Sequence, residues 1–416
     1  MGNVYDSARR YNTTEMCNGL TELTKRITYQ ATAFAAEMTR LRRVIHACPE
    51  AAFSEQETSR LAAEALDAAG LDVQTGVAGT GVVATITGSK PGRVAALRAD
   101  MDALPITETT GKSYASQHRG LSHSCGHDGH VAMLIGAGLI LAELREELSG
   151  EIRLIFQPAE EVGAGAGTMI EAGALGDPKP DAIFALHAWP GLPVGIVGSM
   201  PGSMTTSNDL YTLTVTGLGG HGARPHLARS PILGMTELVD RVSALTKIDD
   251  DLELPRVVSV GSVHSGSRAN VIPNEAVIEG TIRAPNIAVR DELYAAIREI
   301  AREVALSQDL QVVFDSHMYC PAVINDLGLY DIFARTAEEL FGPYGWVKMD
   351  RMSMGSEDFA CYLDHVPGLL VRVGTGAESG QLHNGNFDFA DGALRSGASL
   401  MAGMAARAAA GNSTNK

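Results

Sequence analysis

The sequence has no long apolar run, no surplus of basic residues and no paired cysteines. Its longest apolar stretch, residues 131–142, is shorter than the roughly 20 residues that a membrane-spanning helix needs. The first 20 residues also lack the apolar segment of a secretory signal peptide. We therefore expect a soluble protein with no membrane partner.

Negative charge outweighs positive charge, and cysteine is sparse. The formal net charge is −16 over 416 residues, whereas nucleic-acid-binding proteins carry an excess of Lys and Arg. The five cysteines are scattered without paired spacing, which is typical of a reducing compartment. These features predict an acidic cytoplasmic protein with no nucleic-acid partner.

What the sequence does contain is an alternation of strands and helices. Strand-like apolar segments at 82–88, 93–99, 151–156 and 182–186 alternate with helical spacing such as that at 131–148. Such alternation is typical of an α/β domain with a mostly parallel sheet. The length of 416 residues also leaves room for two or three domains.

A second pattern begins after Pro201. Residues 210–217 alternate apolar and polar side chains, which predicts a strand with one exposed face. The segments that follow continue the β-α-β-β-α-β order of a ferredoxin-like unit: a helix at 232–245, strands at 256–266 and 275–285, a helix at 290–305 and a strand at 311–319.

Strand and helix alternation then resumes, so we expect a main domain interrupted by a smaller one. The main domain would consist of residues 1–205 and 319–416, and the inserted domain of residues 206–318. The predicted fold class is α/β, with two domains: a mostly parallel-sheet main domain and an inserted ferredoxin-like α+β domain.

Polar side chains follow the predicted strands where each strand ends, and the segment HSCGHDGH (123–130) lies at a predicted helix start. In an open α/β sheet the carboxyl ends of the strands meet at one edge, where ligands bind. We therefore expect the following residues to converge: Asp100, Asp102, Cys125, His127, Glu160, Glu161, His187 and His383.

Thiolate, imidazole and carboxylate groups together favour zinc or another first-row metal ion. Cys125 and His127 alternate along a segment that we expect to be extended, so both side chains can face one side. The candidate ligands are too many for one tetrahedral ion and fit two ions with Cys125 bridging. These ligands are Cys125, His127, Glu161, His187 and His383.

Two further carboxylates have other predicted roles. Asp102 is a candidate to orient a ligating imidazole. Glu160 precedes Glu161, and adjacent residues of an extended segment point in different directions, so Glu160 can face the substrate. A carboxylate beside a metal-activated water acts as general base and then as general acid in a hydrolase.

Other interpretations of these residues explain less. A reactive Cys125 thiol would need a resolving cysteine or a Cys-His-Asn arrangement, and it leaves Glu160 unused. Asp128 could accept bonds from first-turn amides and so cap the helix, in addition to any metal site. The segment GLGGHG (217–222) matches a dinucleotide pattern, but two prolines follow it where a helix should begin. Its glycines would instead bring His221 close to another backbone segment or to a ligand.

A series of motifs resembles one enzyme family. The segments ALRADMDALPI, HSCGHDGHVAML, QPAEEVGAGA, GGHGARPH, MGSEDF and LHNGNFDF occur in this order. Together they resemble the amidohydrolase branch of the dinuclear metallopeptidases, which includes hippurate hydrolase, N-acyl-amino-acid amidohydrolases and plant auxin-conjugate hydrolases. Aminoacylase and glutamate carboxypeptidase are more distant relatives. The resemblance extends from about residue 46 to residue 389.

The resemblance implies two Mn²⁺ or Zn²⁺ ions held by the five ligands named above, with Glu160 as general acid and base. It implies that His221 polarises the scissile carbonyl, in its own subunit or in that of a partner. It assigns Asn270 and Arg283 to the binding of a small-molecule substrate. It also implies that the inserted domain acts as a lid or forms a homodimer or a higher homo-oligomer.

The sequence thus predicts a metal-dependent hydrolase that cleaves a C–N bond of a small carboxylate-bearing molecule, namely the amide of an N-acyl or N-aroyl amino acid. A hydrolytic deaminase of an aminobenzoate-like aromatic amine is an alternative, because Ala284, Arg372 and Asn386 depart from the residues expected for relatives. An inactive binding or scaffold protein is the alternative of another class. The complete ligand set and Glu160 argue against it.

Overall fold

The computed structural model describes residues 22–248 and 254–411. The chain divides into two compact units. The first consists of Met1–Ser199, Asp326–Met349 and Val366–Lys416, and the second of Met200–Asn325 and Asp350–His365. The domain borders expected from the sequence stay predictions. The α/β class with a large, mostly parallel central sheet is confirmed.

In spatial order, the strands of the first unit's sheet are β1 (Asp72–Val77), β2 (Gly81–Thr87), β4 (Ser149–Gln157), β3 (Lys90–Asp100), β5 (Ala182–Trp189), β16 (Gly368–Gly374), β6 (Val197–Ser199) and β15 (Trp346–Lys348). The central strands β4, β3, β5 and β16 are parallel neighbours, and antiparallel pairs lie toward both edges. The central strands are buried along most of their length, which explains their near-continuous apolar runs.

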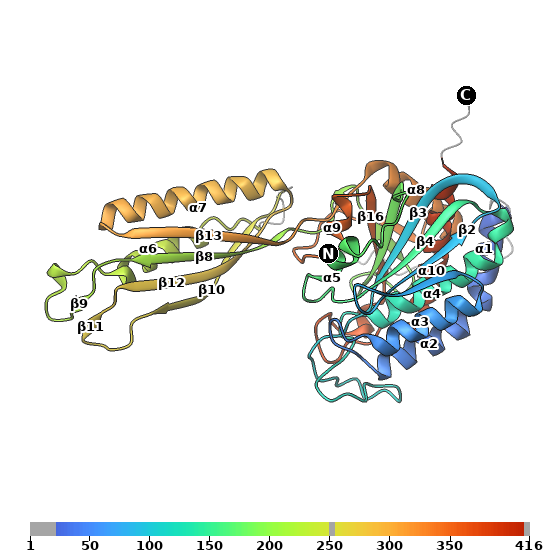
Figure 1. The fold of residues 1–416 in the computed structure, drawn as a ribbon, viewed down its shortest axis with the longest axis horizontal. Helices are drawn as coiled ribbons and strands as arrows, with labels where there is room; N and C mark the ends of the chain where they lie inside the picture. Colours follow the sequence, from blue (N-terminus) through green and yellow to red (C-terminus); the bar gives the residue numbers. More distant parts are fainter. Residues whose placement is uncertain (1–21, 249–253, 412–416) are drawn as a thin grey trace, which may run out of the picture. The chain divides into compact units, whose positions relative to one another are not determined.

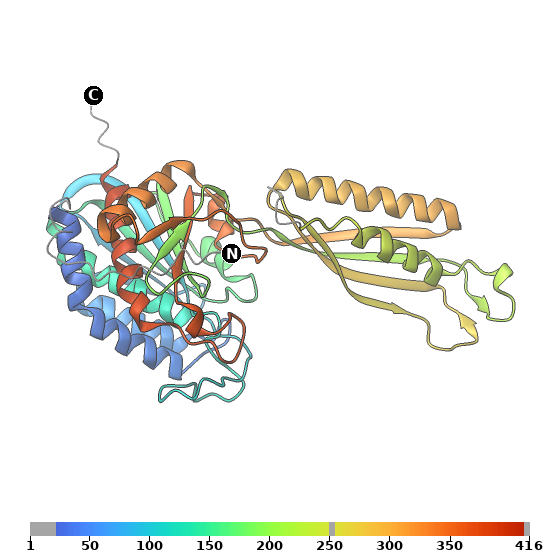
Figure 2. The same cartoon turned by 180° about the vertical axis from the view of Figure 1, so that it is seen from behind.

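The helices of the first unit are α1 (Glu22–Ala33), α2 (Ala35–Ala47), α3 (Gln56–Ala68), α4 (His127–Glu143), α5 (Gly165–Glu171), α8 (Leu327–Phe341) and α10 (Leu394–Ala410), with short 3-10 turns η2 (Arg145–Glu147), η4 (Ala377–Ser379) and η5 (Asp391–Ala393). Figure 2 shows α10 against the sheet, where it contacts β3, β4, β5 and α4. Small residues permit this close packing, because a Cβ on Gly397 would lie 1.9 Å from Met133 Sδ. The helix expected at 131–148 begins earlier, at His127.

The second unit has a four-stranded antiparallel sheet, in the spatial order β10 (Val257–Ser265), β12 (Glu275–Arg283), β8 (Asn208–Thr216) and β13 (Gln311–Cys320). Helices α6 (Pro231–Ser243) and α7 (Ile287–Gln308) cover one face of this sheet, and the chain follows the order β-α-β-β-α-β (Figure 1). Shorter elements are β7 (Gly202–Ser203), β9 (Gly220–His221), η3 (Pro225–Leu227), β11 (Val271–Ile272), β14 (Ile324–Asn325) and α9 (Ala360–Leu363).

A core of its own holds the second unit together. Leu213 on β8 and Ile278 on β12 are fully buried against Leu238 of α6 and Ile297 of α7. Apolar residues alternate with more exposed ones along β8, as its sequence predicts for a sheet covered on one face.

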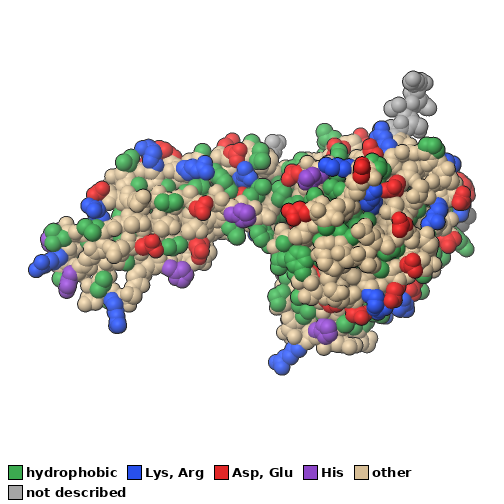
Figure 3. Space-filling view, viewed as in Figure 1, with side chains coloured by type: hydrophobic (Ala, Val, Ile, Leu, Met, Phe, Trp, Pro, Cys, Tyr) green, Lys and Arg blue, Asp and Glu red, His purple; other side chains and the backbone are tan. Residues whose placement is uncertain are grey.

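Charged side chains of both signs are interspersed on the face of the protein seen in Figure 3. None of the helices within the described ranges combines the length and the hydropathy of a membrane-spanning segment.

Candidate metal centre

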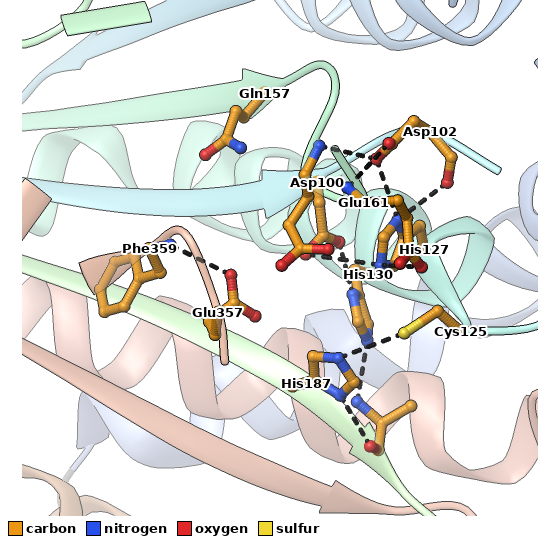
Figure 4. A network of polar contacts seen from close by, with 12 residues as sticks. Asp100, Asp102, Cys125, His127, His130, Gln157, Glu161, His187, Glu357 and Phe359 are labelled. Carbon is orange, nitrogen blue, oxygen red and sulfur yellow. Dashed lines mark hydrogen bonds and ion pairs between the residues drawn. The ribbon is translucent and has the colours of Figure 1, made fainter. Parts of the chain in front are cut away.

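The candidate site lies at the carboxyl ends of β3, β4 and β5, beside the start of α4 (Figure 4). β3 ends at Asp100, β5 carries His187 and α4 begins at His127. Gly126 has a φ of +89°, which glycine adopts without strain. The expectation of an extended segment here is wrong. A turn at Gly126, rather than alternation along a strand, brings Cys125 and His127 together.

Cys125, His127 and His187 form one group of possible ligands. Their ligand atoms lie within 4.8 Å of one another, and Cys125 Sγ is 3.5 Å from His187 Nε2. The Nδ1–H of His127 donates to the backbone oxygen of Asp102, and that of His187 to the backbone oxygen of Ala188, each at 2.8 Å. A neutral ring that donates from Nδ1 keeps a lone pair on Nε2, the form in which imidazole binds metals.

Cys125, Glu161 and His383 form a second group, which shares Cys125 with the first. Glu161 Oε2 is 3.6 Å from His383 Nε2, and Glu161 Oε1 is 3.8 Å from His127 Nε2. His383 has a φ of +58°, a strained conformation for a residue with a side chain. Its N–H donates to Ser124 O at 2.8 Å, and this bond ties the loop that carries His383 to the segment that carries Cys125.

Two buried atoms of the site lack a hydrogen-bond partner among the described residues: His127 Nε2 and Glu161 Oε1. Buried polar atoms are almost always paired, so these two indicate that a further group binds here. Two donors that each lie about 2.1 Å from one ion can be up to about 4.2 Å apart. Cys125 Sγ and His187 Nε2 of the first group are 3.5 Å apart, and Glu161 Oε2 and His383 Nε2 of the second are 3.6 Å apart. The residues therefore fit a divalent metal ion.

The ionisation of the ligands points in the same direction. Burial raises the pKa of the Cys125 thiol well above its ordinary value and raises the pKa of Glu161 to about 7. Burial lowers the pKa of His127, but the charge of Asp100 and the hydrogen bond to Asp102 raise it more, so it lies well above its ordinary value. Without a cation, the protein thus disfavours the ionised forms of the Cys125 thiol and the Glu161 carboxyl group. A bound cation would reverse that preference.

Asp102 anchors the loop that follows β4. Its Oδ1 accepts the N–H of Glu160 and its Oδ2 the N–H of Glu161, each at 3.0 Å. The Nδ1 of His127 lies 2.8 Å from the backbone oxygen of Asp102 and 3.3 Å from the Asp102 carboxylate. The loop is a turn, closed by Gly163 N–H on Glu160 O at 2.7 Å, rather than the extended segment that we expected. A carboxylate oxygen of Glu160 still lies within 4.8 Å of ligand atoms of His127 and Glu161.

Asp100 and His130 make a contact that the sequence analysis missed. Ala188 N–H donates to His130 Nε2 at 2.8 Å, so His130 carries its proton on Nδ1 and donates it to Asp100 Oδ1 at 2.6 Å. Burial raises the pKa of Asp100, but the charges of His127 and Arg98 and the hydrogen bond from His130 lower it to well below its ordinary value. The spacing in the sequence could have indicated this contact. His130 follows His127 by three residues on α4, so both lie on the same face of the helix.

The expectation that Asp128 caps α4 is wrong. The N-cap residue is Gly126, and the buried Asp128 carboxylate lies 2.8 Å from His46 Nδ1 and 3.3 Å from Arg42 Nη1, both on α2. Burial lowers the pKa of His46, but Asp128 and Glu108 raise it more, to about 9. A buried carboxylate needs a cation, because an unpaired charge in the interior is costly.

In the second unit, His221 lies on β9, and Asn270 immediately precedes β11, the strand that pairs with β9. Both are exposed, and Gly222 N–H donates to Asn270 O at 2.9 Å. His221 Nδ1 accepts the N–H of Ala223 at 3.0 Å. A neutral ring with that bond carries its proton on Nε2, where it can be donated to a ligand.

Arg283 lies at the far end of β12 from this pair. β12 begins at Glu275, near β11, and ends at Arg283, so the two ends are about 26 Å apart at roughly 3.3 Å per residue. Figure 1 shows β9 and β11 beyond the end at which β12 begins. Arg283 is half-buried and donates to Met354 O at 3.2 Å. Within one chain the structure thus does not bring His221 and Arg283 together.

Comparison with known proteins identifies relatives along most of the chain. Residues 96–407 match peptidase family M20/M25/M40. Thermostable carboxypeptidase 2 of Saccharolobus solfataricus is 37% identical over 80% of this chain and 85% of that protein. N-acetyl-L-cysteine deacetylase of Bacillus subtilis is 36% identical over 80% of this chain and 79% of that protein.

A solved structure agrees with these relatives. The YXEP protein of Bacillus subtilis, described as a dinuclear metal binding peptidase of family M20, superimposes with a TM-score of 0.81 at 33% identity, over 90% of this chain and 98% of that one. The resemblance drawn from the sequence motifs is confirmed. The chain belongs to peptidase family M20/M25/M40 and is a metal-dependent amidohydrolase.

Proposed function

We propose that this amidohydrolase cleaves the amide bond of a small N-acyl or N-aroyl amino acid and uses two divalent ions, Mn²⁺ or Zn²⁺. The observation that carries the proposal is the pair of ligand groups that share Cys125. Cys125, His127 and His187 would hold one ion, and Cys125, Glu161 and His383 the other. When bound, the ions supply Lewis acidity and a water of lowered pKa.

Glu160 moves the protons of the reaction. Its carboxylate accepts a proton from the attacking water and later gives that proton to the leaving amine. The position of Glu160 supports this role, because its carboxylate lies near His127 and Glu161 and its backbone N–H is held by Asp102. Glu161 would serve as a ligand from the neighbouring position of the same turn.

The second unit supplies the groups that bind the substrate. Arg283 pairs with the substrate carboxylate, Asn270 hydrogen-bonds to the substrate, and His221 Nε2–H donates to the carbonyl oxygen as it gains negative charge. A small substrate cannot contact both His221 and Arg283 of one chain, because about 26 Å of β12 separates them. We therefore assign His221 to the site of a second chain, in a homodimer formed through the inserted unit.

The relatives support this class of substrate. The names N-acetyl-L-cysteine deacetylase and carboxypeptidase both denote hydrolysis of an amide near a carboxylate. A cationic Arg283 suits the same chemistry, since guanidinium and carboxylate form paired hydrogen bonds.

The test is a substrate panel read with and without metal. Metal-free protein is incubated with Mn²⁺ or Zn²⁺ and with N-acetyl amino acids, N-benzoyl amino acids, dipeptides or aminobenzoates, and the released amine is measured. We expect release from the N-acyl or N-aroyl amino acids with metal and none with a chelator. Deamination of aminobenzoates without amide cleavage would show that the protein is an aromatic-amine deaminase instead. Metal binding without turnover of any substrate would show that it is an inactive binding protein.

A further inference from the structure

Three successive backbone N–H groups of the turn that carries Glu160 donate hydrogen bonds to carboxylates. Glu160 N–H and Glu161 N–H donate to Asp102, as described above. The N–H before them, that of Ala159, donates to Glu55 Oε1 at 3.0 Å. Ala159 is fully buried and has a φ of +56°, in the left-handed region that a residue with a Cβ rarely adopts.

Glu55 is a fully buried carboxylate that lies 104 residues before Ala159. Its Oε1 also accepts the N–H of Phe53 at 3.0 Å, and its Oε2 accepts the hydroxyl of Thr80 at 2.6 Å. Burial raises the pKa of Glu55, while the hydrogen bonds from the Thr80 hydroxyl and the Ala159 N–H act to lower it. A buried carboxylate is costly, so its presence at this turn requires a reason.

Helix capping does not explain Glu55. It is the N-cap residue of α3, but the first-turn N–H groups of that helix, those of Glu57 and Thr58, donate to Glu50 at 2.9 Å. The Glu55 side chain is directed instead to Ala159, Phe53 and Thr80.

We propose that Glu55 is a positioning residue for the general base. By holding the Ala159 N–H, it keeps Ala159 in the left-handed conformation and thereby sets the direction in which Glu160 leaves the turn. This inference rests on the proposed role of Glu160. A displacement of about 1 Å in a reacting group is enough to slow an enzyme strongly, so the backbone angle before the base matters.

The test compares four variants by kcat, KM and bound metal. Glu55→Ala removes the acceptor of the Ala159 N–H, and we expect kcat to fall roughly 10- to 100-fold at nearly unchanged KM and metal content. Glu55→Gln keeps an acceptor oxygen and should stay within about 3-fold of wild type. Thr80→Val is the matched control, because it removes a hydrogen bond of Glu55 without touching Ala159.

The fourth variant separates positioning from general stability. Glycine adopts a positive φ without strain, so Ala159→Gly combined with Glu55→Ala should restore kcat by roughly 5-fold or more over Glu55→Ala alone. A purely structural role of Glu55 predicts no such rescue.

Three results would overturn the inference: wild-type kcat in Glu55→Ala, a fall of the same size in Thr80→Val, or no rescue by Ala159→Gly. If Glu55→Ala does not fold, Glu55→Asp takes its place, because its shorter side chain withdraws from Ala159. Glu160→Gln is measured in parallel. Full activity of Glu160→Gln would refute the proposed function itself, whereas an inactive Glu160→Gln with an unaffected Glu55→Ala refutes only the positioning role.

Discussion

Most of the proposed metal ligands of the first unit are buried, whereas His383 and two functional residues of the second unit are exposed. In the first unit Cys125, His127 and His187 are 5%, 0% and 8% exposed, and hydrogen bonds fix the ring of each histidine. In the second unit His221, on the two-residue strand β9, and Asn270, just before the two-residue strand β11, are both exposed.

The difference indicates a division of roles. Side chains that are buried and hydrogen-bonded already hold their ligand atoms in place for a cation. The first unit can therefore bind metal ions with little reorganisation. Exposed residues at the end of a small sheet become fixed in position only when something binds to them. For His221 this would be the substrate and a second chain. Changes at the buried ligands of the first unit should therefore affect metal binding and proton transfer, and a change at His221 should affect turnover in the site of a second chain.

Glu160→Gln should have the largest effect among these substitutions. The amide cannot accept a proton, so kcat should fall roughly 10³-fold, the range of general acid–base catalysis. Bound metal should stay at the wild-type amount, because Glu160 is not one of the five proposed ligands. Turnover and metal content are measured in the same samples, with Glu171→Gln on the surface of α5 as the control. Undiminished turnover would remove Glu160 from the mechanism.

His221→Ala should lower kcat roughly 100-fold, the effect of losing one oxyanion donor. The fold should be unaffected, because the side chain is exposed. His226→Ala, also exposed and close in sequence, is the matched control.

A mixture of His221→Ala and Glu160→Gln tests whether His221 acts on a second chain. In a mixed dimer, the site with an intact Glu160 receives an intact His221 from the other chain, so activity should return to about a quarter of wild type after subunits exchange. No recovery after exchange would place His221 in the site of its own chain.

Asp102→Asn should lower kcat roughly 10-fold, as for other groups that support metal ligands. Asparagine offers one acceptor oxygen where the carboxylate offers two, so either Glu160 N–H or Glu161 N–H loses its partner. Asp181→Asn is the matched control at the amino end of β5, where the carboxylate accepts Val94 N–H at 3.0 Å. Equal losses in both variants would show that Asp102 acts only on stability.

His46→Gln should have the smallest effect on turnover, a few-fold at most, and a clear effect on stability. The pKa of His46 is about 9 in the folded protein against an ordinary 6.5. Its stabilising contribution is therefore complete below pH 6.5 and is lost as the pH rises through 9, a loss of up to about 3 kcal/mol. Urea unfolding at pH 6, 7.5 and 9 should show this decline in wild type and much less of it in His46→Gln. The same decline in both proteins would exclude His46 as its source.

Much of the fold and of the site follows from the sequence, because periodicity and strand ends are local signals. Alternating segments predict the α/β class, and the rule that ligands gather at strand ends is sufficient to select Glu160, Glu161 and His187. Neither signal depends on which distant residues pack together.

What the sequence does not reveal depends on such distant contacts. Asp128 pairs with His46, 82 residues away, so its local position at a helix start is misleading. Glu55 reaches Ala159 over 104 residues, and no spacing rule connects them. The left-handed turn at Gly126, which replaces the expected extended segment, is by contrast a local feature, because glycine adopts that angle without strain.

The central claim is that two ions share Cys125, and a metal titration tests it most directly. Metal-free wild type and Cys125→Ala are titrated with Mn²⁺ or Zn²⁺, and bound ions and amide turnover are measured in the same samples. The account predicts two ions per wild-type chain, turnover that rises as they bind, and fewer bound ions with no turnover in Cys125→Ala. Wild-type metal binding and turnover in Cys125→Ala would contradict it.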